Sequence, residues 1–191
     1  MRYVAGHKDQ TSKRILRAAG KLFRKKGYAA TGIDAVMASA DLTAGAFYAH
    51  FRSKEDLLAK TLDEVFVAGK NDRPVELNEL RGQAWLRAFA SFYLSNQHRK
   101  AAGRGCPMPS LAAEVARIGG KPRAVFGQHV QRVVDGIARQ FDETDPDRQR
   151  AIATMAICVG GVTLARAVND GLAKEILAAC RDAVIKEIDM A

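Results

Sequence analysis

Side chains that bind anions lie close together in one segment, LTAGAFYAHFRSKEDLL, at residues 42–58. They are a phenol, an imidazole and two cations: Tyr48, His50, Arg52 and Lys54. Groups of these types donate hydrogen bonds and positive charge to phosphate oxygens. The residues just before them are small, so a partner can come close to the backbone. This segment therefore predicts a surface for a phosphate-bearing partner.

Cys106 is a second candidate for chemistry, because it lies in the helix break GRGCPMPSLAAE. Cationic residues lie near it in the sequence: Arg99, Lys100 and Arg104. Positive charge lowers the pKa of a thiol and makes it more reactive, which suggests a sensor thiol, although inert packing is the alternative. With His98 or His129 as base, the thiol would be an enzyme nucleophile. No third orienting group or catalytic signature accompanies it, so we expect no enzyme.

Positive charge is concentrated in the same part of the chain as the anion-binding segment. Of the 191 residues, the first 60 hold 12 Lys and Arg against 5 Asp and Glu, a net of +7 out of +9 for the whole chain. The sequence pI is about 9.7. We therefore expect the N-terminal part to bind an anionic partner.

The cysteines and the apolar runs exclude several protein classes. The 3 cysteines are widely spaced, which favours neither a disulfide framework nor a zinc site. The start, MRYVAGHKDQ, lacks the apolar stretch of a signal peptide. The longest uncharged run, AIATMAICVGGVTLA, is shorter than the roughly 20 residues of a membrane span. We expect a soluble cytoplasmic protein with no metal, cofactor or membrane partner.

Helical periodicity predicts the elements that position these side chains, and the absence of period-two alternation predicts an all-α fold. The first helix has one apolar stripe: Ile15, Ala18, Ala19, Leu22 and Phe23. It ends at Gly27, which tolerates the left-handed conformation at a helix C-terminus. Residues 31–34 then resemble a capping box with Thr31 as N-cap, which predicts a short second helix.

A tight turn at Asp41 and Leu42 separates the second helix from a third, which Thr43 caps and which runs to about residue 50. Residues 53–56 form another capping box and begin a helix to about residue 68. The segment at 69–79 is a loop or boundary. Further helices are predicted at 80–98, 110–118, 123–141, 147–168 and 171–188. The helix at 147–168 starts from Asp145 as N-cap, and the last helix carries one apolar stripe: Leu172, Ile176, Cys180, Ala183 and Val184.

Two short helices joined by a tight turn in a basic three-helix unit predict a helix-turn-helix. Residues 12–58 resemble the N-terminal DNA-binding domain of the TetR family of bacterial transcriptional repressors. The resemblance is carried by AAGKLFRKKGYAAT, by the turn before LTAGAFYAHF and by SKEDLL. It implies a helix-turn-helix domain at residues 1–60 and a helical effector-binding and dimerisation domain at 61–191. A homodimer would bind a palindromic double-stranded operator and leave it when a small molecule binds.

The resemblance also implies which residues contact DNA. Thr31 and Lys54 would meet phosphates at the starts of their helices, and Tyr48 and His50 would form a phosphate-contacting pair. The recognition helix would face base edges with Thr43, Ala44 and Gly45. The sequence departs from the family pattern twice, with Asp41 where the turn often has Gly and Ala44 where Lys is common. Asp tolerates the left-handed conformation, so the turn is still expected.

The resemblance places an effector pocket among the C-terminal helices. Its candidate residues are Trp85, Phe89, Phe92, Tyr93, Cys106, Phe126, His129 and Met155. Mostly apolar and aromatic lining predicts an apolar or electrophilic effector. Core packing is the alternative for the aromatic residues of helix 80–98. We expect the last two helices to pair with their copies in a four-helix dimer interface, helped by Gly160 and Gly161. A non-specific DNA-coating protein is a further alternative, which the large, nearly neutral C-terminal part disfavours.

Overall fold

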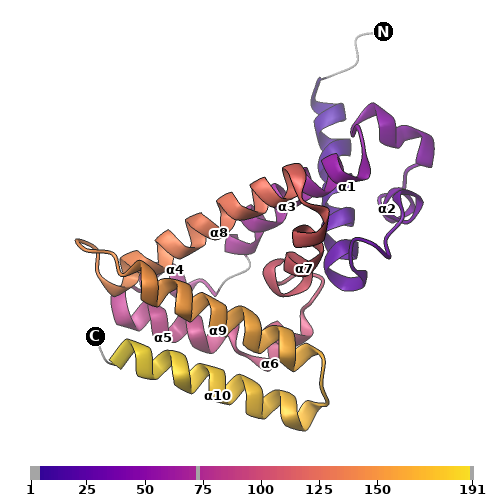
Figure 1. Cartoon of the computed structure of the whole chain (residues 1–191). Helices are drawn as coiled ribbons and strands as arrows, with labels where there is room; N and C mark the ends of the chain where they lie inside the picture. The colour runs from indigo at the N-terminus through magenta and orange to yellow at the C-terminus, as the bar shows by residue number, and fades with distance from the viewer. Residues whose placement is uncertain (1–4, 72–73, 190–191) are drawn as a thin grey trace. The chain divides into compact units, whose positions relative to one another are not determined.

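The structure, a computed structural model, describes residues 5–71 and 74–189. Within these ranges every regular element is a helix (Figure 1), which confirms the predicted all-α fold. The chain divides into two compact units. The first contains the described residues of 1–70 and 106–127, and the second contains those of 71–105 and 128–191. The domain boundary at residue 60 stays a prediction.

The first unit contains the N-terminal helices and a later segment that returns to them. Its elements are α1 (Ala5–Lys26), α2 (Ile33–Ser39), the 3-10 helix η1 (Ala44–Ala49), α3 (Lys54–Asn71), α7 (Met108–Ile118) and the start of α8 (Gly120–Phe141). The predicted third helix is thus a 3-10 helix, with the Ala46 N–H bonded to the Thr43 carbonyl. A six-residue helix that contains Gly45 has little propensity for the wider α turn.

The core of the first unit follows the predicted apolar stripe of α1. Ile15, Ala19 and Phe23 are fully buried there, together with Met37 of α2 and Phe47 of η1. The helix ends as predicted, because Gly27 has a φ of +87°. The helix-turn-helix is therefore held by apolar contacts between α1 and the two short helices.

The helix starts in the first unit confirm one predicted cap and correct another. The Ser53 hydroxyl accepts the Asp56 N–H at 3.1 Å, as the second capping box requires. The first capping box is wrong: α2 has Gly32 as its N-cap. Because Thr31 belongs to the turn after α1, its hydroxyl donates to the Gly27 carbonyl at 2.7 Å instead.

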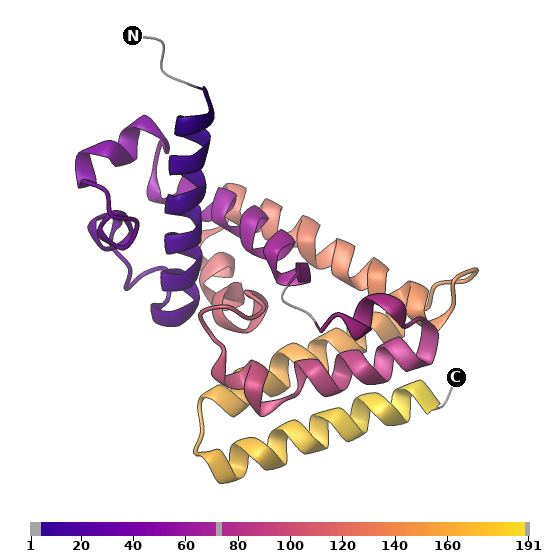
Figure 2. The same ribbon diagram turned by 180° about the vertical axis from the view of Figure 1, so that it is seen from behind.

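The second unit is built around three helices that lie side by side in both views (Figures 1 and 2). They are α5 (Gly82–Tyr93), α9 (Arg148–Arg166) and α10 (Asp170–Asp189). The second unit also contains α4 (Glu76–Glu79), α6 (Asn96–Lys100) and the rest of α8. The predicted single helix at 80–98 is wrong, since it breaks after Leu94. The Ser95 hydroxyl accepts the His98 N–H at 3.0 Å and starts α6 as a new helix.

Other elements of the second unit also shift from their predicted bounds. α4 lies inside the segment expected as a loop, part of which, residues 72–73, falls outside the described residues. The N-cap of α9 is Asp147, not Asp145, because the Asp147 carboxylate accepts the Arg150 N–H at 2.9 Å. The stripe predicted for α10 meets the buried face of this helix at Val184, whereas its Leu172 is exposed. The buried residues of α10 are Ala173, Leu177, Val184 and Ile188.

Gly161 permits close contact between α9 and its neighbours. A Cβ at this position would lie 2.8 Å from the Cys180 Sγ of α10 and 3.1 Å from a methyl group of Leu94. Gly160 is different, because no atom lies within 4 Å of its Cβ position. The glycine pair therefore has one member packed inside the protomer and one turned away from it.

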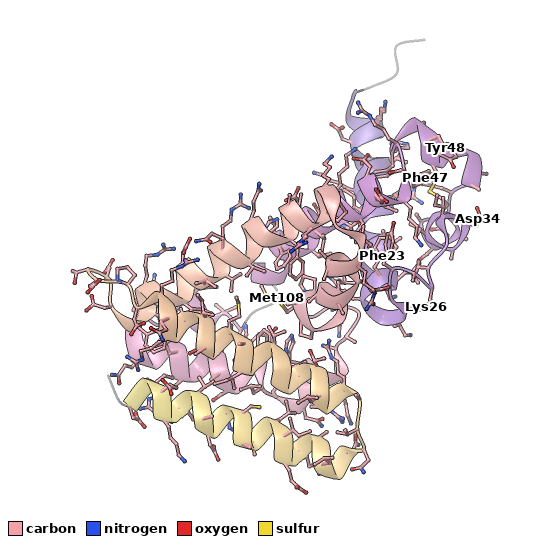
Figure 3. All side chains as sticks on the ribbon, in the orientation of Figure 1. Phe23, Lys26, Asp34, Phe47, Tyr48 and Met108 are labelled. Carbon is pink, nitrogen blue, oxygen red and sulfur yellow. The ribbon has the colours of Figure 1, made fainter. Side chains whose placement is uncertain are left out.

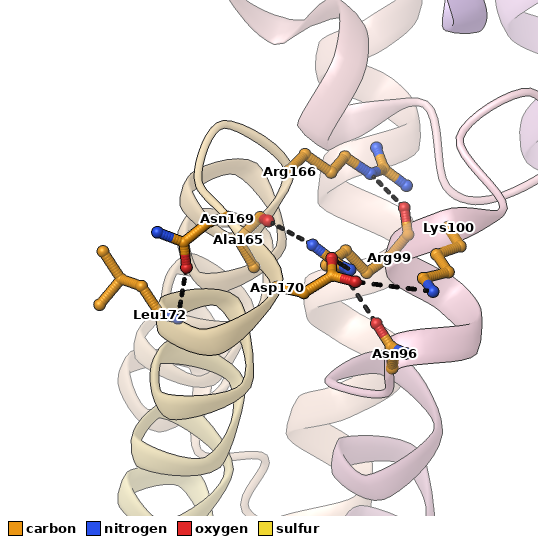
Figure 4. A network of polar contacts seen from close by, with 8 residues as sticks. All are labelled: Asn96, Arg99, Lys100, Ala165, Arg166, Asn169, Asp170 and Leu172. Carbon is orange, nitrogen blue, oxygen red and sulfur yellow. Dashed lines mark hydrogen bonds and ion pairs between the residues drawn. The ribbon is translucent and has the colours of Figure 1, made fainter.

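Two arginines cap each other's helices in the second unit (Figure 4). Arg99 in the last turn of α6 donates to the Ala165 carbonyl near the end of α9 at 3.1 Å. Arg166, the last residue of α9, donates to the Arg99 carbonyl at 3.0 Å. Arg99 also binds Asp170, and this hydrogen bond and its charge lower the pKa of the Asp170 carboxyl. Cations at helix C-termini satisfy carbonyls that lack intrahelical partners, so the network joins α6 to the turn between α9 and α10.

Candidate nucleic-acid interface

The outer face of η1 carries the small residues predicted to meet base edges. Thr43, Ala44 and Gly45 are all exposed. Tyr48 is 72% exposed, whereas its neighbour Phe47 is fully buried (Figure 3). The two rings pack edge to face, with centroids 5.1 Å apart. Tyr48 is therefore an anchored but open phenol.

Arg14 holds the turn that precedes η1. Asp41 has the left-handed φ of 53° expected at this position. The Arg14 Nη2 donates to the Ala40 carbonyl at 2.6 Å and lies 3.7 Å from the Asp41 carboxylate. Arg14 thus caps the C-terminus of α2 from α1. Sequence reasoning missed this role, since 26 positions separate Arg14 from Ala40 and no local motif links them.

His50 ends η1 and is half-buried. Partial burial lowers the pKa of its imidazole, and the positive charge of Lys8 on α1 lowers it further. A phosphate beside the ring would act in the opposite direction, because an anion favours the imidazolium form.

Lys54 begins α3 with its ammonium group 4.2 Å from the centroid of the Tyr28 ring. This distance is within the range of a cation–π contact. Partial burial lowers the pKa of Lys54, and the nearby Glu114 carboxylate opposes that shift. The lysine is thus held in place beside the turn at residues 27–31.

Thr31 is the predicted DNA contact that the structure buries most deeply, with 1% of its surface exposed. Its hydroxyl binds the Gly27 carbonyl and its N–H binds the Tyr28 carbonyl at 3.2 Å. Thr31 therefore shapes the turn that leads into α2. A phosphate contact at Thr31 stays a prediction.

The candidate effector residues of α5 form a ladder of aromatic rings. Trp85 stacks on Phe89 with centroids 4.9 Å apart and planes at 7°, and Phe89 lies 5.5 Å from Tyr93. Phe92 stacks on His98 at 5.7 Å, and Tyr93 at the end of the ladder lies 4.5 Å from the same imidazole. The four aromatic rings of the predicted stripe are therefore linked, three of them directly and Phe92 through His98. Whether the ladder lines a pocket stays a prediction.

The remaining effector candidates divide between the two units. His129 on α8 and Met155 on α9 are buried in the second unit. Phe126 belongs to the first unit, where its ring lies 5.7 Å from that of Phe66. Cys106 also belongs to the first unit and is half-buried.

All three cysteines are thiols, and Cys158 is buried. Cys180 is half-buried, and desolvation raises the pKa of its thiol. Of the cations predicted to activate Cys106, Arg99 and Lys100 both pair with Asp170, at an Nζ–Oδ2 distance of 4.0 Å for Lys100. Their charge is therefore shared with a carboxylate rather than reserved for a thiol.

Among the residues that the structure describes, no group of three or more His, Cys, Asp or Glu side chains has the geometry to hold a metal ion. None of their helices combines the length and the apolar character that crossing a membrane requires.

Replacing Lys54 by alanine should weaken binding to all DNA sequences alike, because we expect its ammonium group to pair with a phosphate. The slope of log Kobs against log salt should fall by about one unit, as for the loss of a single phosphate contact. Fluorescence anisotropy at several salt concentrations measures both quantities. An unchanged affinity with an unchanged slope would show that Lys54 serves only its contact with Tyr28.

The Asp56 carboxylate should make the first unit sensitive to acid. Burial raises its pKa, but bonds from Lys60, Lys121 and the Arg52 N–H outweigh burial and lower it to about 2. Because the folded-state pKa lies below the unfolded one, the stabilisation is complete above about pH 4 and is lost between pH 4 and 2. We expect Asp56→Asn to reduce the free energy of unfolding by about 1–2 kcal/mol at neutral pH.

Urea unfolding at pH 7, 4 and 2.5 checks this dependence. The difference between wild type and Asp56→Asn should shrink as the pH falls. Glu143→Gln, which removes an exposed carboxylate, is the control and should change stability little at any pH. A difference that stays constant from pH 7 to 2.5 would contradict the assigned pKa.

Comparison with proteins of known sequence points to the same N-terminal region. Residues 15–61 match the family model described as bacterial regulatory proteins, tetR family. The uncharacterized HTH-type transcriptional regulator YerO of Bacillus subtilis is 44% identical over 50 residues, which are 26% of this chain and 17% of YerO. The transcriptional regulator AcuR of Cereibacter sphaeroides is 27% identical over 115 residues, 54% of this chain and 48% of AcuR. The matched segments thus span less than half of either relative.

Solved structures extend the similarity over most of the chain. The reduced form of NemR from Escherichia coli has a TM-score of 0.77 at 21% identity, covering 92% of this chain and 95% of that one. A TetR-family regulator from Cytophaga hutchinsonii has a TM-score of 0.79 at 18% identity, covering 95% and 96%. At these identities the likeness shows the fold, an N-terminal helix-turn-helix followed by a C-terminal helical domain.

Proposed function

Since the chain belongs to the TetR family of bacterial regulatory proteins, we propose that this transcriptional regulator is a ligand-responsive repressor. It binds a palindromic operator as a homodimer in the cytoplasm and is released by a small apolar or electrophilic effector. Regulators of this family are in general not enzymes. We therefore propose no catalytic role for Cys106.

The observation that carries this proposal is the outer face of η1. It combines exposed small residues with the open phenol of Tyr48, in the most basic part of the chain. Small residues let the backbone approach base edges, while Tyr48, His50 and Lys54 reach phosphates on either side.

The proposal of a homodimer is supported by apolar surface on the last two helices. α9 has no charged residue between Arg150 and Arg166, yet Ile152 and Leu164 on it are 49% and 59% exposed. On α10, Leu172 is 44% exposed. Exposed apolar side chains on adjacent helices are typical of an interface, and the open Gly160 would let a partner helix approach closely. Two copies would then present two recognition helices to two half-sites.

The proposal of an apolar effector is supported by the aromatic ladder of α5. Trp85 is half-buried at one end of the ladder, and Phe89 and Tyr93 are buried. Stacked rings offer a flat apolar surface with the Trp85 edge still accessible. We place the effector against this ladder, with Met155 and His129 as further candidates from the same unit.

Titration of DNA from the region upstream of the chain's own gene tests the proposed function. With excess competitor DNA, we expect a saturable complex that a small apolar or electrophilic compound dissociates. Because the chain has 1 Trp, its fluorescence reports on Trp85 alone. If competitor DNA removed all binding, the result would contradict the proposal of a specific repressor. An effector that releases DNA without changing the Trp85 emission would remove Trp85 from the effector site.

Cys106 should react with N-ethylmaleimide faster than the other two thiols, and its modification should weaken operator binding. Cys158 is buried, and burial raises the pKa of Cys180, so both have less accessible thiolate. Mass spectrometry after brief labelling of the native protein gives the order of reaction, and Cys106→Ser is the control. Slower labelling at Cys106, or full operator affinity after labelling, would contradict a sensor role.

A further inference from the structure

Glu114 on α7 binds the turn that connects α1 to α2. Its carboxylate accepts the Tyr28 N–H and the Ala29 N–H, each at 2.8 Å. A Cβ on Gly27 would lie 3.3 Å from the Glu114 Oε2, so the glycine also gives the carboxylate room. Hydrogen bonds from backbone N–H groups to an ionised acceptor are among the stronger ones in proteins. Residues more than 80 positions apart thus meet inside the first unit.

The turn that Glu114 binds fixes the start of α2. Within it, the Thr31 hydroxyl and N–H bind the carbonyls of Gly27 and Tyr28. α2 begins at Ile33, directly after this turn. The direction of α2, and of the turn and η1 that follow, therefore depends on how the segment at residues 27–31 is held.

The same turn also holds a predicted phosphate contact. The ring of Tyr28 supports the ammonium group of Lys54. The charge of Glu114 favours the protonated form of Lys54 and, after burial and Glu55, contributes to the raised pKa of the Tyr28 phenol. Glu114 thus acts on both sides of the helix-turn-helix, on α2 through the backbone and on α3 through the Tyr28–Lys54 pair.

We propose that Glu114 is a positioning residue for operator binding, which it supports without touching DNA. By holding the turn at residues 27–31, it sets η1 and Lys54 at the spacing that the operator requires. The proposal rests on the proposed function. It also predicts the direction of the change in DNA affinity. If only electrostatics acted, removing a negative charge from a DNA-binding unit would strengthen binding to any DNA. Loss of a positioning contact weakens binding to the operator instead.

Glu114→Ala and Glu114→Gln test the proposal against two duplexes: the sequence that wild type selects from a random library, and a scrambled duplex of equal length. We expect Glu114→Ala to bind the selected duplex about tenfold more weakly and Glu114→Gln several-fold more weakly. Binding to the scrambled duplex should be unchanged or slightly tighter, with the same salt slope. Glu143→Gln removes the same charge from an exposed loop and should bind both duplexes as wild type does.

Thermal unfolding of each variant separates positioning from general stability. Because Glu114→Gln keeps the size of the side chain, it should remain folded even if Glu114→Ala does not. Equal or tighter binding of a folded variant to the selected duplex would overturn the proposal, as would a parallel loss on both duplexes. A wild type that selects no sequence would refute the proposed function, which is a distinct result.

Discussion

Gly45→Gln should abolish operator binding while leaving the fold intact. No atom lies within 4 Å of the Cβ position of Gly45, and its φ is not positive, so a side chain fits the isolated protein without strain. On DNA, the same side chain would occupy the space where η1 approaches the base edges. We expect the affinity for the operator to fall by a factor of about 100 or more, while the melting temperature changes by about 2 °C or less.

Gly69→Gln is the matched control for this substitution. Gly69 also lies on a helix of the first unit with no atom within 4 Å of its Cβ position, but it is near the far end of α3. Anisotropy with the operator duplex and circular dichroism of both variants separate the effects. Full operator binding by Gly45→Gln would show that η1 does not face the DNA.

Leu164→Glu should convert the proposed dimer into monomers. The side chain is 59% exposed in the protomer, so a carboxylate is tolerated there. In a four-helix interface it would be buried beside its symmetry copy, and burying a charge without a partner is costly. We expect light scattering at micromolar concentration to give the monomer mass. Operator affinity should fall by a factor of about 100 or more, because each monomer reads one half-site.

Val67→Glu provides the control, since Val67 on α3 has the same exposed fraction of 59%. It introduces the same charge outside the last two helices and should leave the molecular mass unchanged. A wild type that is monomeric, or a Leu164→Glu variant that stays dimeric and binds the operator, would contradict the α9–α10 interface.

Local patterns in the sequence predicted the features that depend on neighbouring residues. The apolar stripe of α1, the left-handed Gly27 and Asp41, and the Ser53 cap are all confirmed. Each of them depends on side-chain periodicity or on the conformation of a single residue. The all-α fold class could be predicted because helical periodicity recurs along the chain.

Features that join distant segments could not be predicted in this way. Arg14 meets Ala40 and Glu114 meets Tyr28 only after the chain has folded back. The Ser95 cap was missed because neither Gly nor Pro marks the break between α5 and α6.

The difference between the stripe predicted for α10 and the face that is buried in the protomer has another cause. Apolar residues lie on two faces of this helix, one buried in the protomer along Leu177 and Val184 and one that includes the exposed Leu172. A helix with two apolar faces has no single phase in its sequence pattern. A second apolar face, exposed in the protomer, is what the proposed dimer interface would produce.

The most direct test of the central claim is selection of DNA by the purified wild-type chain from a random-sequence library at physiological salt. A two-fold dimer that reads base edges with η1 should enrich one motif with inverted half-sites about 10 base pairs apart, or a multiple of that spacing. Enrichment of no motif, or of a single half-site without symmetry, would contradict a sequence-specific dimeric regulator.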